Sequence, residues 1–170
     1  TEIGSYAFSD CSGLTSVTIP QGVTTIGAFA FQYCSGLTSV TIPQGVTTIG
    51  EYAFNGCDNL TNIILPPTLR NISYDAFCSC DNLKEIRIPS SVRTIGESAF
   101  SGCGNLKDVY VYVVEPFSIS QNTFTKNGNN FIGTLHAPKV SYWDYYYDTQ
   151  WSQFLSFAEF DEPYDNFYLE

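Results

Sequence analysis

Cysteine and histidine are the residues of this chain best suited to catalysis or metal binding. Five of its six cysteines recur every 23 residues: Cys11, Cys34, Cys57, Cys80 and Cys103. A zinc site needs cysteine pairs that converge on one point, and neither this column nor the Cys78-Ser79-Cys80 segment has that spacing. We therefore expect buried, free thiols along the column. Cys78 takes a place that polar residues hold in the other copies, so it is expected to be the one exposed thiol.

His136 is the single histidine, so a Ser-His-Asp or Cys-His catalytic arrangement would have to use it. The chain has no Gly-x-Ser-x-Gly motif, and its glycines are spread along the sequence instead of clustering in a phosphate-binding loop. His136 falls on the outward side of an expected strand, which favours a surface histidine over a catalytic one. We predict no enzymatic activity, no metal site and no cofactor.

The cysteine spacing belongs to a repeat that covers most of the chain. Its consensus is I-G-x-x-A-F-x-x-C-x-x-L-x-x-V-x-I-P-x-x-V-x-x. Val and Ile alternate in the Leu-x-x-Val-x-Ile segment, which is typical of a strand with one buried side, and proline then ends the strand. A second extended segment, Val-Thr-Thr-Ile, follows, and the Ala-Phe pair predicts a single helical or 3₁₀ turn.

One repeat cannot bury its own apolar columns, whereas stacked repeats can. The sequence therefore predicts a solenoid: a right-handed superhelix of mostly β coils, with a parallel β-sheet on one face and short helical or 3₁₀ turns. Ladders of Phe, Leu, Ile and Cys would fill its interior.

The spacing A-F-x-x-C-x-x-L-x-x-V-x-I-P resembles the BspA-like leucine-rich repeats of bacterial surface proteins, over residues 1 to about 112. It departs from the commonest leucine-rich pattern, because apolar residues stand where that pattern places Asn or Cys: Val23, Val46, Leu69 and Val92. The resemblance implies a leucine-rich-repeat solenoid. It also implies a secreted or surface-anchored protein of host-associated bacteria, whose role is adhesion or recognition of host and neighbouring molecules.

We predict three regions along the chain. Residues 1–112 hold the regular repeats and begin in mid-repeat, so we expect a further segment upstream. Residues 113–138 hold an irregular last repeat, in which residues 135–138 (Leu-His-Ala-Pro) resemble a final strand. The polar run 126–130 would form a surface loop that absorbs two extra residues. Residues 139–170 hold an aromatic, acidic cap and tail.

Aromatic residues crowd the start of this last region. Trp151, Phe154 and Phe157 recur at steps of three residues, which predicts one face of a helix. Every solenoid needs its open end covered, so we interpret these aromatics as a cap, and some of residues 145–147 (Tyr-Tyr-Tyr) must stay exposed. A sugar-stacking platform is the alternative interpretation.

Charge and hydropathy exclude some partners. The formal net charge is −10, and seven acidic residues but no Lys or Arg follow residue 140. Nucleic acid is not an expected partner, because phosphate binding needs clustered Lys and Arg. No apolar run reaches the ~18–20 residues of a membrane span, and no signal-peptide pattern begins the sequence given.

The outward-facing residues of the strands are the best candidates for a binding site. One outward column reads, in chain order, Thr18, Thr41, Ile64, Arg87, Tyr110 and His136. The first coils carry a uniform Thr/Ser ladder, whereas the later coils diversify, and Tyr and Arg are typical interface anchors. We predict a ligand-contact patch made of Lys84, Arg87, Lys107 and Tyr110. The alternative is an ordinary solvated sheet face with Lys-Glu pairs.

Three functional hypotheses follow. The leading one is a non-enzymatic, extracellular recognition module whose strand face binds an unidentified protein or glycan. The others are a purely structural spacer in a larger surface protein, and a carbohydrate-binding module that uses the C-terminal aromatics. An open first coil would also present unpaired strand edges, which favours end-to-end self-association.

Overall fold

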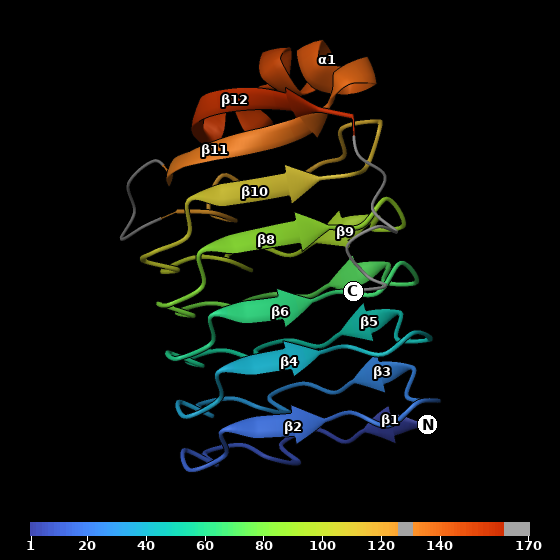
Figure 1. Ribbon diagram of the computed structural model, residues 1–170, viewed down its shortest axis with the longest axis vertical. Coiled ribbons are helices and arrows are strands. Elements are labelled where there is room, and N and C mark those ends of the chain that lie inside the picture. The colour runs from blue at the N-terminus through green and yellow to red at the C-terminus, as the bar shows by residue number, and fades with distance from the viewer. Residues whose placement is uncertain (126–130, 162–170) are drawn as a thin grey trace.

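Two strand-forming segments recur in every regular coil of the computed structural model, which describes residues 1–125 and 131–161. The longer strands are β2 (Ser16–Thr18), β4 (Ser39–Thr41), β6 (Asn62–Ile64), β8 (Glu85–Ile88) and β10 (Asp108–Val111). The shorter strands are β1 (Glu2–Ile3), β3 (Thr25–Ile26), β5 (Thr48–Ile49), β7 (Asn71–Ile72) and β9 (Thr94–Ile95). Figure 1 shows both sets stacked along the long axis of the molecule.

The strands form parallel sheets whose register follows the repeat. The short strands build one five-stranded sheet, in the order β1-β3-β5-β7-β9. The longer strands build a three-stranded sheet, β2-β4-β6, and a four-stranded sheet, β12-β11-β10-β8. Between regular coils the paired residues are one repeat apart, as in Val17 with Val40 and Ile26 with Ile49. The predicted solenoid with parallel sheets is confirmed.

Phenylalanine rings form a continuous ladder inside the solenoid. The rings of Phe8, Phe31, Phe54, Phe77, Phe100 and Phe124 stack with centroids 5.1 to 5.3 Å apart. Phe31 is fully buried, whereas Phe8, in the first coil, is 38% exposed. Phe124 continues the ladder beyond the regular repeats, so the irregular last repeat keeps the same core column.

The cysteine column forms a second buried ladder. Each buried thiol donates a hydrogen bond to a phenylalanine carbonyl of the preceding coil, as Cys57 Sγ does to Phe31 O at 3.2 Å and Cys103 Sγ to Phe77 O at 3.1 Å. All six cysteines are free, which confirms the prediction of free thiols. The column is therefore a set of small apolar groups that also satisfy buried carbonyls.

The prediction that Cys78 is the one exposed thiol is wrong. Cys78 is half-buried, with its Sγ 3.7 Å from the Ser79 hydroxyl. The exposed thiol is that of Cys11, which belongs to the same column but lies in the first coil of the sequence given, and that coil has a neighbouring coil on one side only. Exposure follows position in the stack and not the polarity of the column.

The Ala-Phe segment forms turns that do not continue into a helix. Ala30 N donates to Gly27 O at 3.3 Å within the coil, but Phe31 N donates to Ala53 O of the next coil at 2.8 Å. This alternation places Phe29 and Tyr33 at positive φ, 60° and 56°. Such backbone is uncommon for an aromatic residue, and it prevents a run of helical bonds.

The chain then closes the stack with β11 (Phe131–Pro138), η1 (Lys139–Ser141), α1 (Tyr142–Tyr147), η2 (Trp151–Gln153) and β12 (Phe154–Phe160). β11 pairs with β10 and aligns Leu135 with Val109, so the strand expected at residues 135–138 is present, but β12 follows it and makes it the last strand but one. The loop expected at residues 126–130 lies outside the described residues. Among the described residues, no helix has the length and apolar character needed to span a bilayer.

The single helix face expected from Trp151 to Phe157 is wrong. Trp151 lies in the short helix η2, and Phe154 and Phe157 lie in β12, which pairs in parallel with β11. The hydrogen bonds that this segment forms with the open edge of β11 stabilise a strand, and they outweigh the helical preference suggested by the three-residue spacing. On a strand, residues three apart point to opposite sides, and Phe154 is buried while Phe157 is half-buried.

These C-terminal elements cover the end of the solenoid, as Figure 1 shows. Trp151 and Tyr145 are fully buried. Trp151 Nε1 donates to Phe117 O at 2.9 Å, and the Tyr145 hydroxyl donates to Val113 O at 2.8 Å. Tyr147 is 74% exposed, as expected for a run of three tyrosines that one short segment cannot bury.

We expect Phe31→Ala to lower the free energy of unfolding by about 3–5 kcal/mol, because the substitution leaves a cavity inside the ring ladder. Phe8→Ala is the matched control in the same column, and it should cost less than about half as much, because Phe8 is partly exposed. Urea unfolding followed by circular dichroism measures both. Equal losses for the two variants would contradict the ladder as a buried core.

We expect Ellman's reagent to modify Cys11 quickly and Cys78 slowly in the native protein, and the four buried cysteines only after denaturation. Burial raises the pKa of Cys34 from 9.0 to about 11, so a change from pH 7 to pH 9 should not activate it. The chain unfolded in guanidinium chloride provides the control and should titrate six thiols. Rapid reaction of any thiol other than Cys11 in the folded protein would refute this placement.

Candidate ligand-binding face

The outward side of β8, β10 and β11 brings together the residues of the expected site. Strand pairing aligns Arg87 with Tyr110, and Tyr110 with His136. Side chains alternate along a strand, so Ile86 and Ile88 enter the core while Arg87 points outward between them. The same alternation directs Tyr110 outward from β10.

The three side chains form a stack across the strands. The Arg87 guanidinium carbon lies 4.1 Å from the centroid of the Tyr110 ring. The His136 ring lies parallel to Tyr110, with centroids 4.1 Å apart and an interplanar angle of 13°. Because β8 and β11 flank β10, Tyr110 is held between a cation and a second ring. A cation–π contact of this kind contributes roughly 0.5–1 kcal/mol at a partly exposed site.

Neighbouring polar groups fix the two ends of this stack. Arg87 donates from Nε to Glu85 at 3.1 Å and from Nη1 to the Tyr112 hydroxyl at 3.2 Å. At the other end, His136 Nε2 lies 2.8 Å from an Asp108 carboxylate oxygen. The side chains of Arg87 and His136 are only 24% and 18% exposed, so the stack is a preorganised surface and not a set of mobile chains.

Burial and neighbouring charges change the ionisation of this stack. Burial lowers the pKa of Arg87, but the hydrogen bond to Tyr112 and the charge of Glu85 together outweigh it, so the pKa of Arg87 is raised. Burial is also the largest cause that raises the pKa of Tyr110, and it outweighs the opposing effect of Arg87. Arg87 therefore stays charged and Tyr110 stays a neutral hydroxyl at physiological pH.

The two lysines of the expected patch lie just before β8 and β10. Lys84 and Lys107 are both exposed, and Lys107 N donates to Lys84 O at 2.9 Å, so the two residues are direct neighbours on adjacent coils. Within the described part of the chain neither makes an ion pair. Glu85 pairs with Arg87 and leaves Lys84 without that partner. The structure thus joins Arg87 to Tyr110 directly and places the lysines beside each other at the entry to the same strands.

Tyr112 and Phe160 belong to this face but were not expected there. Their rings meet edge to face with centroids 4.6 Å apart, and Phe160 also lies 6.1 Å from Tyr110. Phe160 reaches the face because β12 extends the sheet, which the helical interpretation of this segment concealed. The loss of the proline column at Tyr112 was the one available sequence signal.

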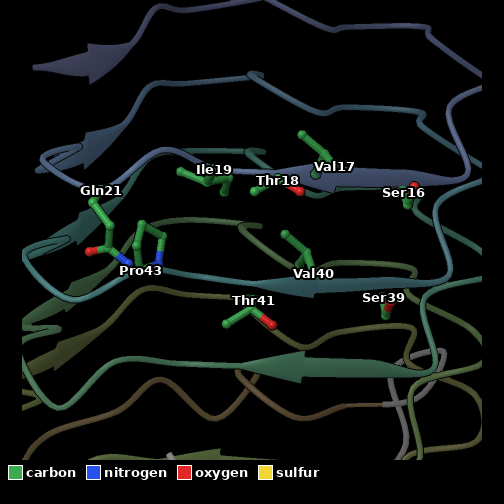
Figure 2. A pocket seen from close by; sticks show the side chains of 9 residues that line it. All are labelled: Ser16, Val17, Thr18, Ile19, Gln21, Ser39, Val40, Thr41 and Pro43. Atoms are coloured by element: carbon green, nitrogen blue, oxygen red, sulfur yellow. The ribbon is translucent and has the colours of Figure 1, made fainter.

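The first coils offer a different surface. An open depression of about 350 Å³ lies over β2 and β4. Figure 2 shows the side chains that line it. Ser16, Thr18, Ser39 and Thr41 line it together with Val17 and Val40, and no charged side chain takes part. Its polar groups are hydroxyls and the Gln21 amide. It lacks a charged group, so it is a weaker candidate for specific recognition than the later strands.

The cap also exposes aromatic residues. On α1, Trp143 is 61% exposed and Tyr147 is 74% exposed, and their rings lie nearly parallel with centroids 5.9 Å apart. These rings stand outside the coil stack, so no neighbouring coil covers their faces. Among the described residues, no three His, Cys, Asp or Glu side chains gather closely enough to hold a metal ion.

Comparisons with known proteins agree with this architecture. The family model of the BspA type leucine rich repeat region matches residues 1–130 with six copies. A leucine-rich repeat protein from Bacteroides ovatus is 36% identical, with a TM-score of 0.63 over 80% of this chain and 37% of its own. The leucine-rich repeat protein TpLRR of T. pallidum is 26% identical, with a TM-score of 0.65 over 95% of this chain and 64% of its own.

The pneumococcal vaccine antigen PcpA shares the fold, with a TM-score of 0.67 at 20% identity, over 88% of this chain and 42% of its own. No curated protein matches the sequence. The chain spans less than two thirds of the length of each of these three solved structures. With six repeat copies matched and the same solenoid observed, this chain belongs to the family of BspA-type leucine-rich repeat proteins.

Proposed function

We propose that this chain is a non-enzymatic, extracellular recognition module that binds a protein or glycan through the outward face of β8, β10 and β11. The observation that carries the proposal is the Arg87–Tyr110–His136 stack beside the exposed pair Lys84 and Lys107. The proposal includes a surface or secreted location, as expected for a BspA-type repeat protein, and no catalytic step.

The stack suits recognition because its side chains are already ordered. Binding must otherwise immobilise flexible groups, and that cost falls when neighbours hold Arg87 and Tyr110 in place. Arginine and tyrosine are also the side chains most often found to dominate binding energy at interfaces. A regular strand stack does not need these residues, since Thr18 and Thr41 fill the same column in the first coils.

Charge supports the same face. Three of the seven Lys and Arg residues of this acidic chain lie here: Lys84, Arg87 and Lys107. Arg87 is balanced by Glu85, whereas the two lysines offer ammonium groups to acceptors on a ligand. A ligand with carboxylate, sulfate or carbonyl groups would gain the most from this arrangement.

A carbohydrate-binding role for the cap is the second candidate, and the exposed, nearly parallel rings of Trp143 and Tyr147 favour it. Sugar rings pack on open aromatic faces, and these two residues are not covered by a coil. A purely structural spacer is the third candidate, and it requires no ligand on either surface.

We expect a screen against host matrix proteins, mucins and glycans to yield a saturable ligand that the Arg87→Ala, Tyr110→Ala double variant binds at least about tenfold more weakly. The control is Thr18→Ala, Thr41→Ala, which changes the same outward column in the first coils and should leave affinity within about twofold. Surface plasmon resonance measures the affinity, and circular dichroism checks that each variant is folded.

Each other outcome counts against the strand face. Equal binding by the double variant and the control would place the site elsewhere. A sugar that shifts tryptophan fluorescence, with the shift lost in Trp143→Ala, would favour the cap. Failure of every ligand at micromolar concentration would favour the spacer.

A further inference from the structure

The repeat breaks at Tyr112, in the fifth coil. In the first four coils a proline ends the strand: Pro20, Pro43, Pro66 and Pro89. The residue three positions later then closes a tight turn, as Val92 N does by donating to Pro89 O at 3.1 Å. After Tyr112 the chain instead bends at residues 114–115.

The segment around this bend, residues 113–119, is hydrogen-bonded to the cap and not to the neighbouring short strand β9. The five-stranded sheet ends at β9, and residues 117–119 form no strand. Ile119 N donates to the Gln150 side chain at 3.1 Å, and Phe117 O accepts from Trp151. The Tyr145 hydroxyl donates a hydrogen bond to Val113 O. Residues 113–119 are thus fixed in a path that the regular coils do not follow.

A hollow of about 480 Å³ lies beside this irregular path. The residues that line it include Val92, Arg93, Val113, Glu115, Pro116 and Phe117. Val114, which also lines it, is exposed, and Pro116 and Phe117 are half-buried, so apolar side chains offer accessible surface in its wall. The volume falls within the range of roughly 300–1,000 Å³ that is typical of small-molecule sites.

Two opposite charges lie on the rim of this hollow. Arg93 and Glu115 are exposed, and within the described residues they form no ion pair with each other. Arg93 Nη1 donates to Ser90 O at 2.8 Å and to Val92 O at 2.9 Å, which orients the guanidinium group. Its remaining N–H groups can then donate to a ligand. A guanidinium matches a carboxylate in two parallel hydrogen bonds.

We propose that this hollow binds a free hydrophobic α-amino acid, with its carboxylate at Arg93, its ammonium at Glu115 and its side chain against Val114, Pro116 and Phe117. The three chemical features of such a ligand correspond to the three features of the hollow. The site is distinct from the strand face and does not depend on the function proposed there.

Isothermal titration calorimetry of the full chain with L-leucine and L-phenylalanine tests the proposal. Saturable binding is expected, and N-acetyl-leucine and leucinamide, which each lack one charge, should bind at least about tenfold more weakly. Arg93→Gln and Glu115→Gln should each weaken binding of L-leucine by about tenfold. Arg70→Gln is the matched control, because Arg70 lies one coil earlier in the same column and does not line the hollow.

Three results would overturn the proposal. They are no saturable binding of either amino acid up to about 10 mM, binding of L-leucine by both hollow variants as strong as by the unmodified chain, or binding of N-acetyl-leucine and leucinamide as strong as that of L-leucine. The analogue series uses the unmodified chain, so it tests the proposal even where a variant fails to fold.

Discussion

Hydrogen bonding between successive coils is the constraint on which this molecule depends. Parallel strands lie about 4.8 Å apart, so every residue of a regular coil is stacked on its equivalent one repeat away. The ring ladder follows directly, with Phe31 and Phe54 centroids 5.1 Å apart. Side chains reinforce the same spacing, since Thr61 Oγ1 donates to Thr38 O at 3.1 Å. A buried column must therefore accept a side chain of similar size and polarity in each coil, and this is why the inward-facing positions repeat so closely.

Departure from that register is what allows the stack to end. Phe124 keeps its place in the ring ladder, but its next neighbours are Phe154, at a centroid distance of 5.1 Å, and Trp151, at 6.2 Å. Cap side chains also take over backbone groups that another coil would otherwise bond. The same change in path closes the core and opens the hollow near Arg93, because residues 113–119 bond to the cap and no longer follow β9.

The sequence predicted those features that the repeat itself encodes. The repeat spacing of Ile26 and Ile49 defines both a strand and its partner, so the sheets and their register follow from the sequence alone. The contact between Arg87 and Tyr110 needs only that register. A strand with no counterpart in the repeat could not be predicted in this way: β12 forms because β11 offers it an unpaired edge. The contact of Tyr112 with Arg87 likewise joins residues 25 positions apart, which is not the repeat spacing.

Stacking also limits the kind of ligand that each surface can accept. Tyr110 lies between Arg87 and His136, so both faces of its ring are covered, and only its edge and hydroxyl group point outward. A neutral sugar that needs an open aromatic face gains little there. A partner that presents carboxylates, carbonyls or other acceptors gains contacts with Tyr110 and with the neighbouring lysines. Trp143 and Tyr147 lie on a helix outside the stack and keep their rings exposed, so the two surfaces favour different chemistry for a structural reason.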